Sequence, residues 1–138
     1  MGSAYRTSDW LSEVDNLALQ ATVAAGDAEA GYLRALAMLI RFRPEVLGGA
    51  GLSPARESDV MRNIAAGAVE TAALRLLPEE AQVMTSTPGP GRFVVSIRLQ
   101  GQRGESTSSG RTFALAIVSA LALSIADKHH DLERTLPG

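Results

Sequence analysis

Apolar and more polar residues alternate through residues 92–100, and this is the clearest periodic pattern in the chain. Every second position carries a large apolar side chain, and these positions are Phe93, Val95, Ile97 and Leu99. Successive side chains of a β-strand point to opposite faces, so a period of two predicts a strand with one buried face. Residues 82–87 also have strand propensity, and the prolines and glycines at 88–91 form a turn. We therefore expect an antiparallel pair.

A second pattern is the absence of charge from residue 112 to residue 126. Alanine and leucine dominate this run, and both are good helix formers. Because nearly every position is apolar, the helix should be buried around most of its circumference. The run has about 15 residues between Arg111 and Asp127, whereas a membrane span needs about 20. It is therefore predicted to be a core helix rather than a membrane span.

This predicted helix has two apolar faces. One face can lie on the inner side of the strand at 92–100. The other face still needs cover, and it consists of Leu115, Val118, Ala122 and Ile125. That cover must come from another part of the chain or from a second copy of it. We take these four residues as the candidate interaction face, with a dimer, another homo-oligomer or a different protein as the expected partner.

Three further helices are predicted from apolar residues that recur at spacings of three and four. The first covers residues 8–25, and its apolar stripe comprises Trp10, Val14, Leu17, Ala21 and Ala24. The second runs from about residue 28 to Phe42. The third begins at residue 54 or 58 and continues to residue 77, where Pro78 ends it. Its small residues at 65–68 would allow another backbone to approach closely.

These elements predict an α+β fold, in which an N-terminal helical hairpin precedes an α-β-β-(β)-α unit with a small antiparallel sheet packed against helices. The third strand, at residues 104–108, is the least apolar of the predicted elements. The length of 138 residues fits a single domain, 1–138. The glycines at 48–51 mark a boundary between subdomains at 8–47 and 54–132.

Residues 58–128 are similar to a double-stranded-RNA-binding domain. The similarity lies in the element order and in residues 92–105, where alternating apolar residues lead through a glycine turn to a small-residue loop and an alanine-rich helix. That family places a pair of lysines at the start of this helix, where Phe113 and Ala114 stand in this chain. The resemblance therefore implies the topology of a degenerate member that lacks the basic residues. Such members look like protein-interaction or dimerisation modules.

Composition and charge argue against nucleic acid as the partner. The formal net charge is −2, and Lys128 is the single lysine. Affinity for a phosphate backbone comes from clustered basic residues, so nucleic acid is disfavoured. The alternative function is a module for double-stranded RNA that uses scattered arginines. Its candidate contacts are Arg34, Arg41, Arg98 and Arg103.

The segment before the last helix suggests a second alternative, a small-anion site. Backbone N–H groups, hydroxyls and a guanidinium would converge there, at Ser108, Ser109, Gly110, Arg111 and Thr112. Ordinary N-capping of the helix by Ser109 or Thr112 explains the same residues. No Walker-type or glycine-rich nucleotide spacing supports the anion interpretation.

Residues for catalysis or metal binding are few. Cysteine is absent, which leaves neither a disulfide framework nor a thiol nucleophile. His129, His130 and Asp131 are adjacent, and neighbouring side chains on a helix point about 100° apart, so they are poorly placed to share one ion. We expect no cofactor, no metal, no catalytic residue and no membrane association. The N-terminus has no apolar segment typical of a secretory signal, so a cytoplasmic location is expected.

Overall fold

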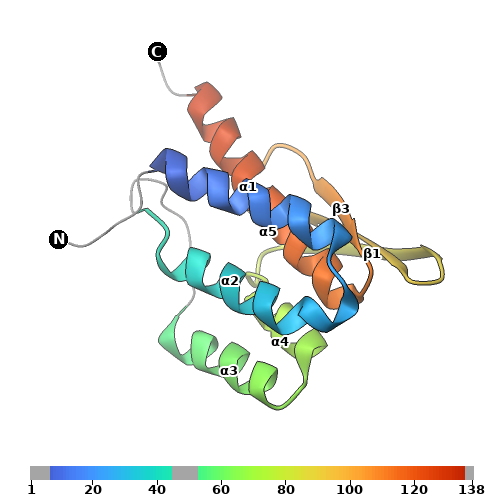
Figure 1. Cartoon of the computed structure of the whole chain (residues 1–138). Helices are drawn as coiled ribbons and strands as arrows, with labels where there is room; N and C mark the ends of the chain where they lie inside the picture. Colours follow the sequence, from blue (N-terminus) through green and yellow to red (C-terminus); the bar gives the residue numbers. More distant parts are fainter. Residues whose placement is uncertain (1–6, 45–52, 136–138) are drawn as a thin grey trace.

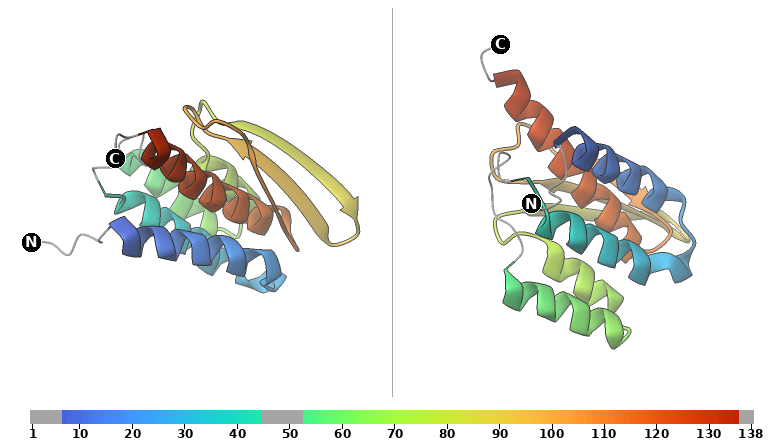
Figure 2. Two further views of the ribbon diagram at one scale, coloured as in Figure 1. Left: turned by 90° about the horizontal axis from the view of Figure 1, so that it is seen from above. Right: turned by 60° about the vertical axis from the view of Figure 1, so that its left-hand side comes forward.

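The helix predicted from the uncharged run is the element on which the others pack. The computed structural model describes residues 7–44 and 53–135. Within these ranges α5 (Phe113–Thr135) contacts two strands on one side and helices α1, α2 and α4 elsewhere (Figure 1). The left view of Figure 2 shows the sheet on one side of α5 and the N-terminal helices on the other. The fold is α+β, as predicted.

The N-terminal helices form the expected hairpin. Helix α1 spans Thr7–Val23, a short 3₁₀ helix follows at Gly26–Ala28, and α2 spans Glu29–Arg41. All five residues of the apolar stripe predicted for the first helix are buried. The indole Nε1 of Trp10 donates a hydrogen bond to the carbonyl of Leu39 at 2.8 Å, which ties the two helices together.

The prediction of a single helix from residue 54 or 58 to residue 77 is wrong, because this segment forms two helices. Helix α3 spans Pro54–Ala65 and α4 spans Val69–Leu76. Gly67 lies between them with φ at +79°, a left-handed conformation that glycine adopts without steric cost and that ends α3. The expected close approach of another backbone is also wrong at Gly67, since a Cβ there would meet no atom within 4 Å.

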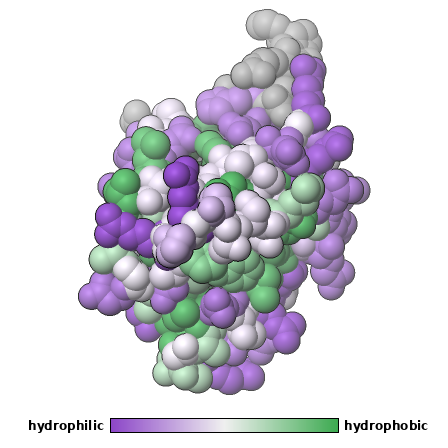
Figure 3. Space-filling model, turned by 90° about the vertical axis from the view of Figure 1, so that its right-hand side faces the viewer, coloured by the Kyte–Doolittle hydropathy of each residue, from purple (hydrophilic) through white to green (hydrophobic). Residues whose placement is uncertain are grey.

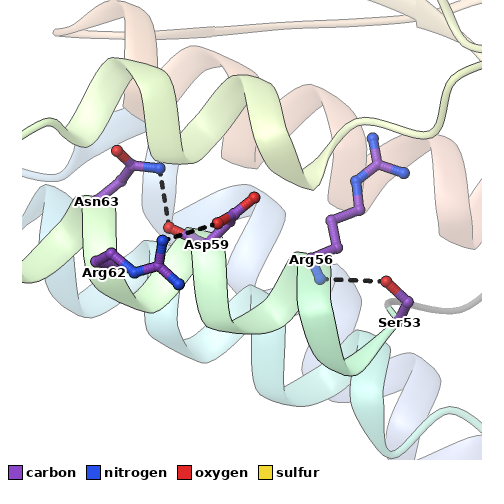
Figure 4. A network of polar contacts seen from close by, with 5 residues as sticks. All are labelled: Ser53, Arg56, Asp59, Arg62 and Asn63. Carbon is purple, nitrogen blue, oxygen red and sulfur yellow. Dashed lines mark hydrogen bonds and ion pairs between the residues drawn. The ribbon is translucent and has the colours of Figure 1, made fainter.

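A polar contact caps the N-terminal end of α3 (Figure 4), and two further contacts of Arg56 join α3 to the end of α4. Ser53 caps α3, because its hydroxyl accepts a hydrogen bond from the backbone N–H of Arg56 at 3.1 Å. The guanidinium of Arg56 donates from Nε to the carbonyl of Arg75 at 2.7 Å and from Nη2 to the carbonyl of Leu77. Arg56 thus satisfies carbonyls at the C-terminal end of α4, where a positive charge is favoured.

The predicted antiparallel pair is present, and the third strand exists two residues later than expected. Strand β1 spans Gln82–Gly89, β2 spans Arg92–Arg98 and β3 spans Ser106–Gly110, in the order β1-β2-β3. The inner face of β2 is buried as the alternation predicts, with Val95 and Ile97 fully inaccessible to solvent.

Small residues in β3 allow α5 to lie close to the sheet. Ser106, Ser108 and Gly110 pair with Ile97, Val95 and Phe93, so they share the inner face. A Cβ on Gly110 would lie 2.6 Å from the backbone nitrogen of Ala116, a distance that side chains do not tolerate. The polar appearance of this segment therefore reflects a need for small side chains.

Buried hydrogen bonds join the β2–β3 connection to α5. The side-chain amide of Gln102 accepts from the N–H of Leu99 at 3.0 Å and donates to the hydroxyl of Ser106 at 2.7 Å. Ser106 in turn donates to the carboxylate of Asp127 at 2.5 Å. The side chains of Gln102, Ser106 and Asp127 are thus all hydrogen-bonded, so the connection is held in one arrangement.

One core joins the parts that the sequence suggested as subdomains. Buried side chains of α1, α2, α3, α4, β2 and α5 form a single hydrophobic cluster. The N-terminal helices therefore pack directly on the α-β-β-β-α unit. The glycines at 48–51 and residues 45–47 of the first suggested subdomain lie outside the described residues.

Candidate functional site

The interaction face predicted on the last helix is covered from within the chain. Leu115, Val118 and Ala122 are fully buried, and Ile125 is partly buried. Helix α1 makes the most extensive helical contact with α5, and the hydroxyl of Ser119 donates to the carbonyl of Ala18 at 2.7 Å. The assignment of these residues as an interaction face is therefore wrong. Of the two sources of cover that the sequence left open, another part of the chain and a second copy, the structure shows the first, because α1 packs on this face.

The residues proposed for an anion do not form a loop. Ser108, Ser109 and Gly110 belong to β3, and the hydroxyl of Ser108 lies 2.6 Å from that of Ser119 beneath α5. The hydroxyl of Thr112 accepts a hydrogen bond from the N–H of Leu115 at 3.2 Å, which is an N-cap interaction. Arg111 is exposed. These hydroxyls serve packing and capping, so they do not converge on a shared anion.

The four candidate arginines lie in two different layers. Arg34 and Arg41 are on α2, whereas Arg98 ends β2 and Arg103 lies in the following connection. Arg41 forms a 3.4 Å ion pair with Glu57, and its guanidinium lies 5.3 Å from the ring centre of Phe42. Arg98 donates from Nε to the carbonyl of Gln102 at 3.2 Å. Helix α2 and the sheet lie on different sides of α5 (Figure 2), so the four do not form one basic surface.

The two histidines lie on α5, and His129 is buried. The rings of His129 and His130 have centres 6.1 Å apart and are tilted by 59°. Among the side chains that the structure describes, in residues 7–44 and 53–130, no three histidine, aspartate or glutamate side chains are grouped so that they could hold a metal ion.

Strands β1 and β3 form the two edges of the sheet, and the residues of β1 are the more exposed of the two. Strand β1 pairs only with β2, and all of its residues except Val83 and Gly89 are exposed. Residues 82–86 pair regularly with 94–98, and a bulge interrupts the register between Ser86 and Gly89. Natural edge strands are protected by charge, by proline or by bulges. Residues 81–91 carry no charge, and Pro88 and the bulge lie in the turn-end part of β1, beyond the regular pairing of residues 82–86.

The hairpin of β1 and β2 extends beyond the helices at its turn end, as Figures 1 and 2 both show. Figure 3 views the molecule from that side. Its centre is drawn mostly in the pale colours of residues near neutral hydropathy, with both hydrophilic and hydrophobic residues around it. Met84 is the most exposed large apolar side chain of the sheet, at 69%. The uncharged stretch at 81–91 was the sequence signal for this edge.

A groove of about 460 Å³ lies at the same end of the molecule. Its lining combines the N-terminal ends of α2, α4 and α5 with Phe93 of β2, and it comprises Glu29, Gly67, Ala68, Val69, Glu70, Thr71, Phe93, Thr112 and Phe113. Phe93 and Phe113 pack edge to face with ring centres 6.5 Å apart. The lining thus contains two carboxylates, two aromatic rings and no basic side chain. Sequence reasoning missed this groove because its residues come from four distant segments.

Exposed apolar side chains also occur in pairs on the outer helices. Leu19 and Val23 are 69% exposed on α1, and Met38 and Phe42 are about half exposed on α2. Both pairs are separated by four residues, so each pair occupies one helix face. They lie on helices, whose backbone groups are paired within the helix, so they offer no free backbone groups to a partner strand.

None of the helices in the described part of the chain combines the length and the apolar character needed to cross a bilayer. Comparisons with models of protein families, with curated proteins and with solved structures found no match.

Proposed function

We propose that this chain is a non-catalytic protein-interaction module that binds an extended segment of another protein along β1. The observation that carries the proposal is an uncharged edge strand that is exposed on both faces and paired on one side only. Such an edge offers a row of backbone N–H and C=O groups to a further strand. Backbone hydrogen bonds would supply affinity, and alternate side chains of the partner would supply specificity.

The rest of the fold supports this use of β1. Helix α5 packs on β2 and β3, and buried hydrogen bonds anchor the β2–β3 connection to α5. The edge is thus presented by a rigid support, which lowers the entropic cost of binding a strand. Self-association through α5 has no support, because Leu115, Val118 and Ala122 are fully buried within one copy of the chain.

The two alternatives receive less support. Binding of double-stranded RNA would need basic residues on one face, and the candidate arginines are divided between two layers. An anion at residues 108–112 would need hydroxyls that are already engaged in the contacts to Ser119 and Leu115.

Panning a phage-displayed library of twelve-residue peptides on the wild-type protein tests the proposal. The matched reference proteins are Met84→Pro and Thr85→Pro. Neighbouring N–H groups of a strand point in opposite directions, so one of these prolines removes a group that faces β2 and the other removes one that faces outward. The proline that removes the outward N–H should leave the pairing with β2 intact and therefore keep the wild-type unfolding transition. That variant is called the edge-blocked protein.

The proposal predicts peptides that bind the wild-type protein and lose binding on the edge-blocked variant. Failure to enrich any peptide would contradict it. So would peptides that bind the edge-blocked variant as well as the wild-type protein, because their site would lie elsewhere.

A further inference from the structure

We propose that the segment bound at β1 carries a lysine or arginine whose side chain enters the groove between Glu29, Glu70, Phe93 and Phe113. This inference rests on the proposed function and specifies the chemistry of the partner. It depends on two observations that are independent of the free edge, namely the position of the groove and the composition of its lining.

The strand register shows which face of the sheet the groove lies on. Thr85 pairs with Val95, and Phe93 shares the inner face with Val95. A strand added outside β1 keeps the same alternation, so every second side chain of the partner faces the side on which the groove lies. Figure 1 shows α4 toward the β1 side of the sheet, and the first turn of α4 forms one wall of the groove. The proposal places a long side chain of the partner strand in this space.

The lining favours a cation with an aliphatic stem. Glu29 and Glu70 provide formal negative charges, and the groove contains no lysine or arginine to offset them. The adjacent helix N-termini carry only partial positive charge, which is smaller than that of two carboxylates. The rings of Phe93 and Phe113 give apolar surface for a methylene chain and an electron-rich face for an ammonium or guanidinium group.

The peptides enriched on wild-type protein and lost on the edge-blocked variant are the probes for this inference. We expect a basic residue at one position among them, with β-branched or polar residues at the alternate positions. Replacing that residue by methionine keeps the stem and removes the charge. In titrations followed by fluorescence polarisation, this change should lower affinity for the wild-type protein by about five- to tenfold.

The double variant Glu29→Gln/Glu70→Gln isolates the contribution of the groove. Both glutamates retain solvent exposure, so the fold should persist. On this variant the basic peptide and its methionine counterpart should bind within about twofold of each other. Glu13→Gln is the matched control, because Glu13 is an exposed glutamate on α1 outside the groove lining, and it should preserve the wild-type difference.

Two results would overturn the inference while leaving strand binding at β1 intact. One is enrichment of edge-dependent peptides without a preferred basic position. The other is an equal loss on methionine replacement in the wild-type protein and the double variant. A panning experiment without any edge-dependent peptide would instead contradict the proposed function, and the inference would fail with it.

Discussion

Gly110 shows how one residue sets the distance between the sheet and α5. A methyl group at this position would lie 2.6 Å from the nitrogen of Ala116 and 2.9 Å from the carbonyl carbon of Leu115. Both are backbone atoms of a buried helix, so they cannot move aside as a flexible side chain would. We predict that Gly110→Ala lowers the free energy of unfolding by about 1–3 kcal/mol.

Urea unfolding followed by the fluorescence of Trp10 measures this change. Trp10 of α1 is the only tryptophan in the sequence. Its side chain is fully buried and donates a hydrogen bond to the carbonyl of Leu39 on α2. Gly31→Ala is the control, because Gly31 is an exposed position of α2 at which an added Cβ meets no atom within 4 Å. That change should stabilise by roughly 0.5–1 kcal/mol. Wild-type stability in Gly110→Ala would show that β3 and α5 are not packed this closely.

At the scale of elements, Arg56 holds the C-terminal end of α4 against α3. Its guanidinium donates to the carbonyls of Arg75 and Leu77. We predict that Arg56→Ala lowers the free energy of unfolding by about 1–2 kcal/mol, since a charged donor to helix-end carbonyls is lost. The same urea titration measures the effect.

Arg62→Ala provides the comparison on the same helix. Arg62 forms an ion pair with Asp59 at 3.3 Å, and both side chains are largely open to solvent. Exposed pairs contribute little, so this change should stay within about 0.5 kcal/mol of wild type. Equal effects of the two substitutions would contradict a specific role of Arg56 in holding α4.

Sequence patterns predicted the elements that obey a simple periodicity. Strand β2 followed from its period of two, α1 from its apolar stripe, and the burial of α5 from its lack of charge. The break at Gly67 was missed because alanines on both sides are compatible with a continuous helix. Strand β3 was predicted at 104–108, two residues too early. Its inward-facing residues are serine and glycine, because α5 packs closely on them, and such residues produce no apolar alternation in the sequence.

The candidate sites were harder to predict, because they depend on which elements meet. The face of α5 that contains Leu115, Val118 and Ala122 was identified as needing cover, but periodicity does not reveal which element provides it. Likewise, Glu29, Glu70 and Phe93 are far apart in the chain and line one groove only after folding. The uncharged stretch at 81–91 was visible in the sequence, yet its position at the sheet edge was not.

At the scale of the whole molecule, the layers around α5 leave the β1 edge of the sheet uncovered. Helices α1 and α2 cover α5, α5 covers β2 and β3, and β1 is left with a single paired edge. The strand most available to a partner therefore contributes only the partly buried Val83 to the hydrophobic core. Binding there would leave the buried layers unchanged, which fits a module that presents a preformed edge.

Mapping an edge-dependent peptide onto the protein by NMR is the most direct test of binding at β1. We predict that residues 82–87 show the largest amide shift changes, that their outward N–H groups become protected from hydrogen exchange, and that cross-strand contacts join them to the peptide. Changes centred instead on Leu19 and Val23 of α1, or on Met38 and Phe42 of α2, with residues 82–87 unaffected, would contradict the account.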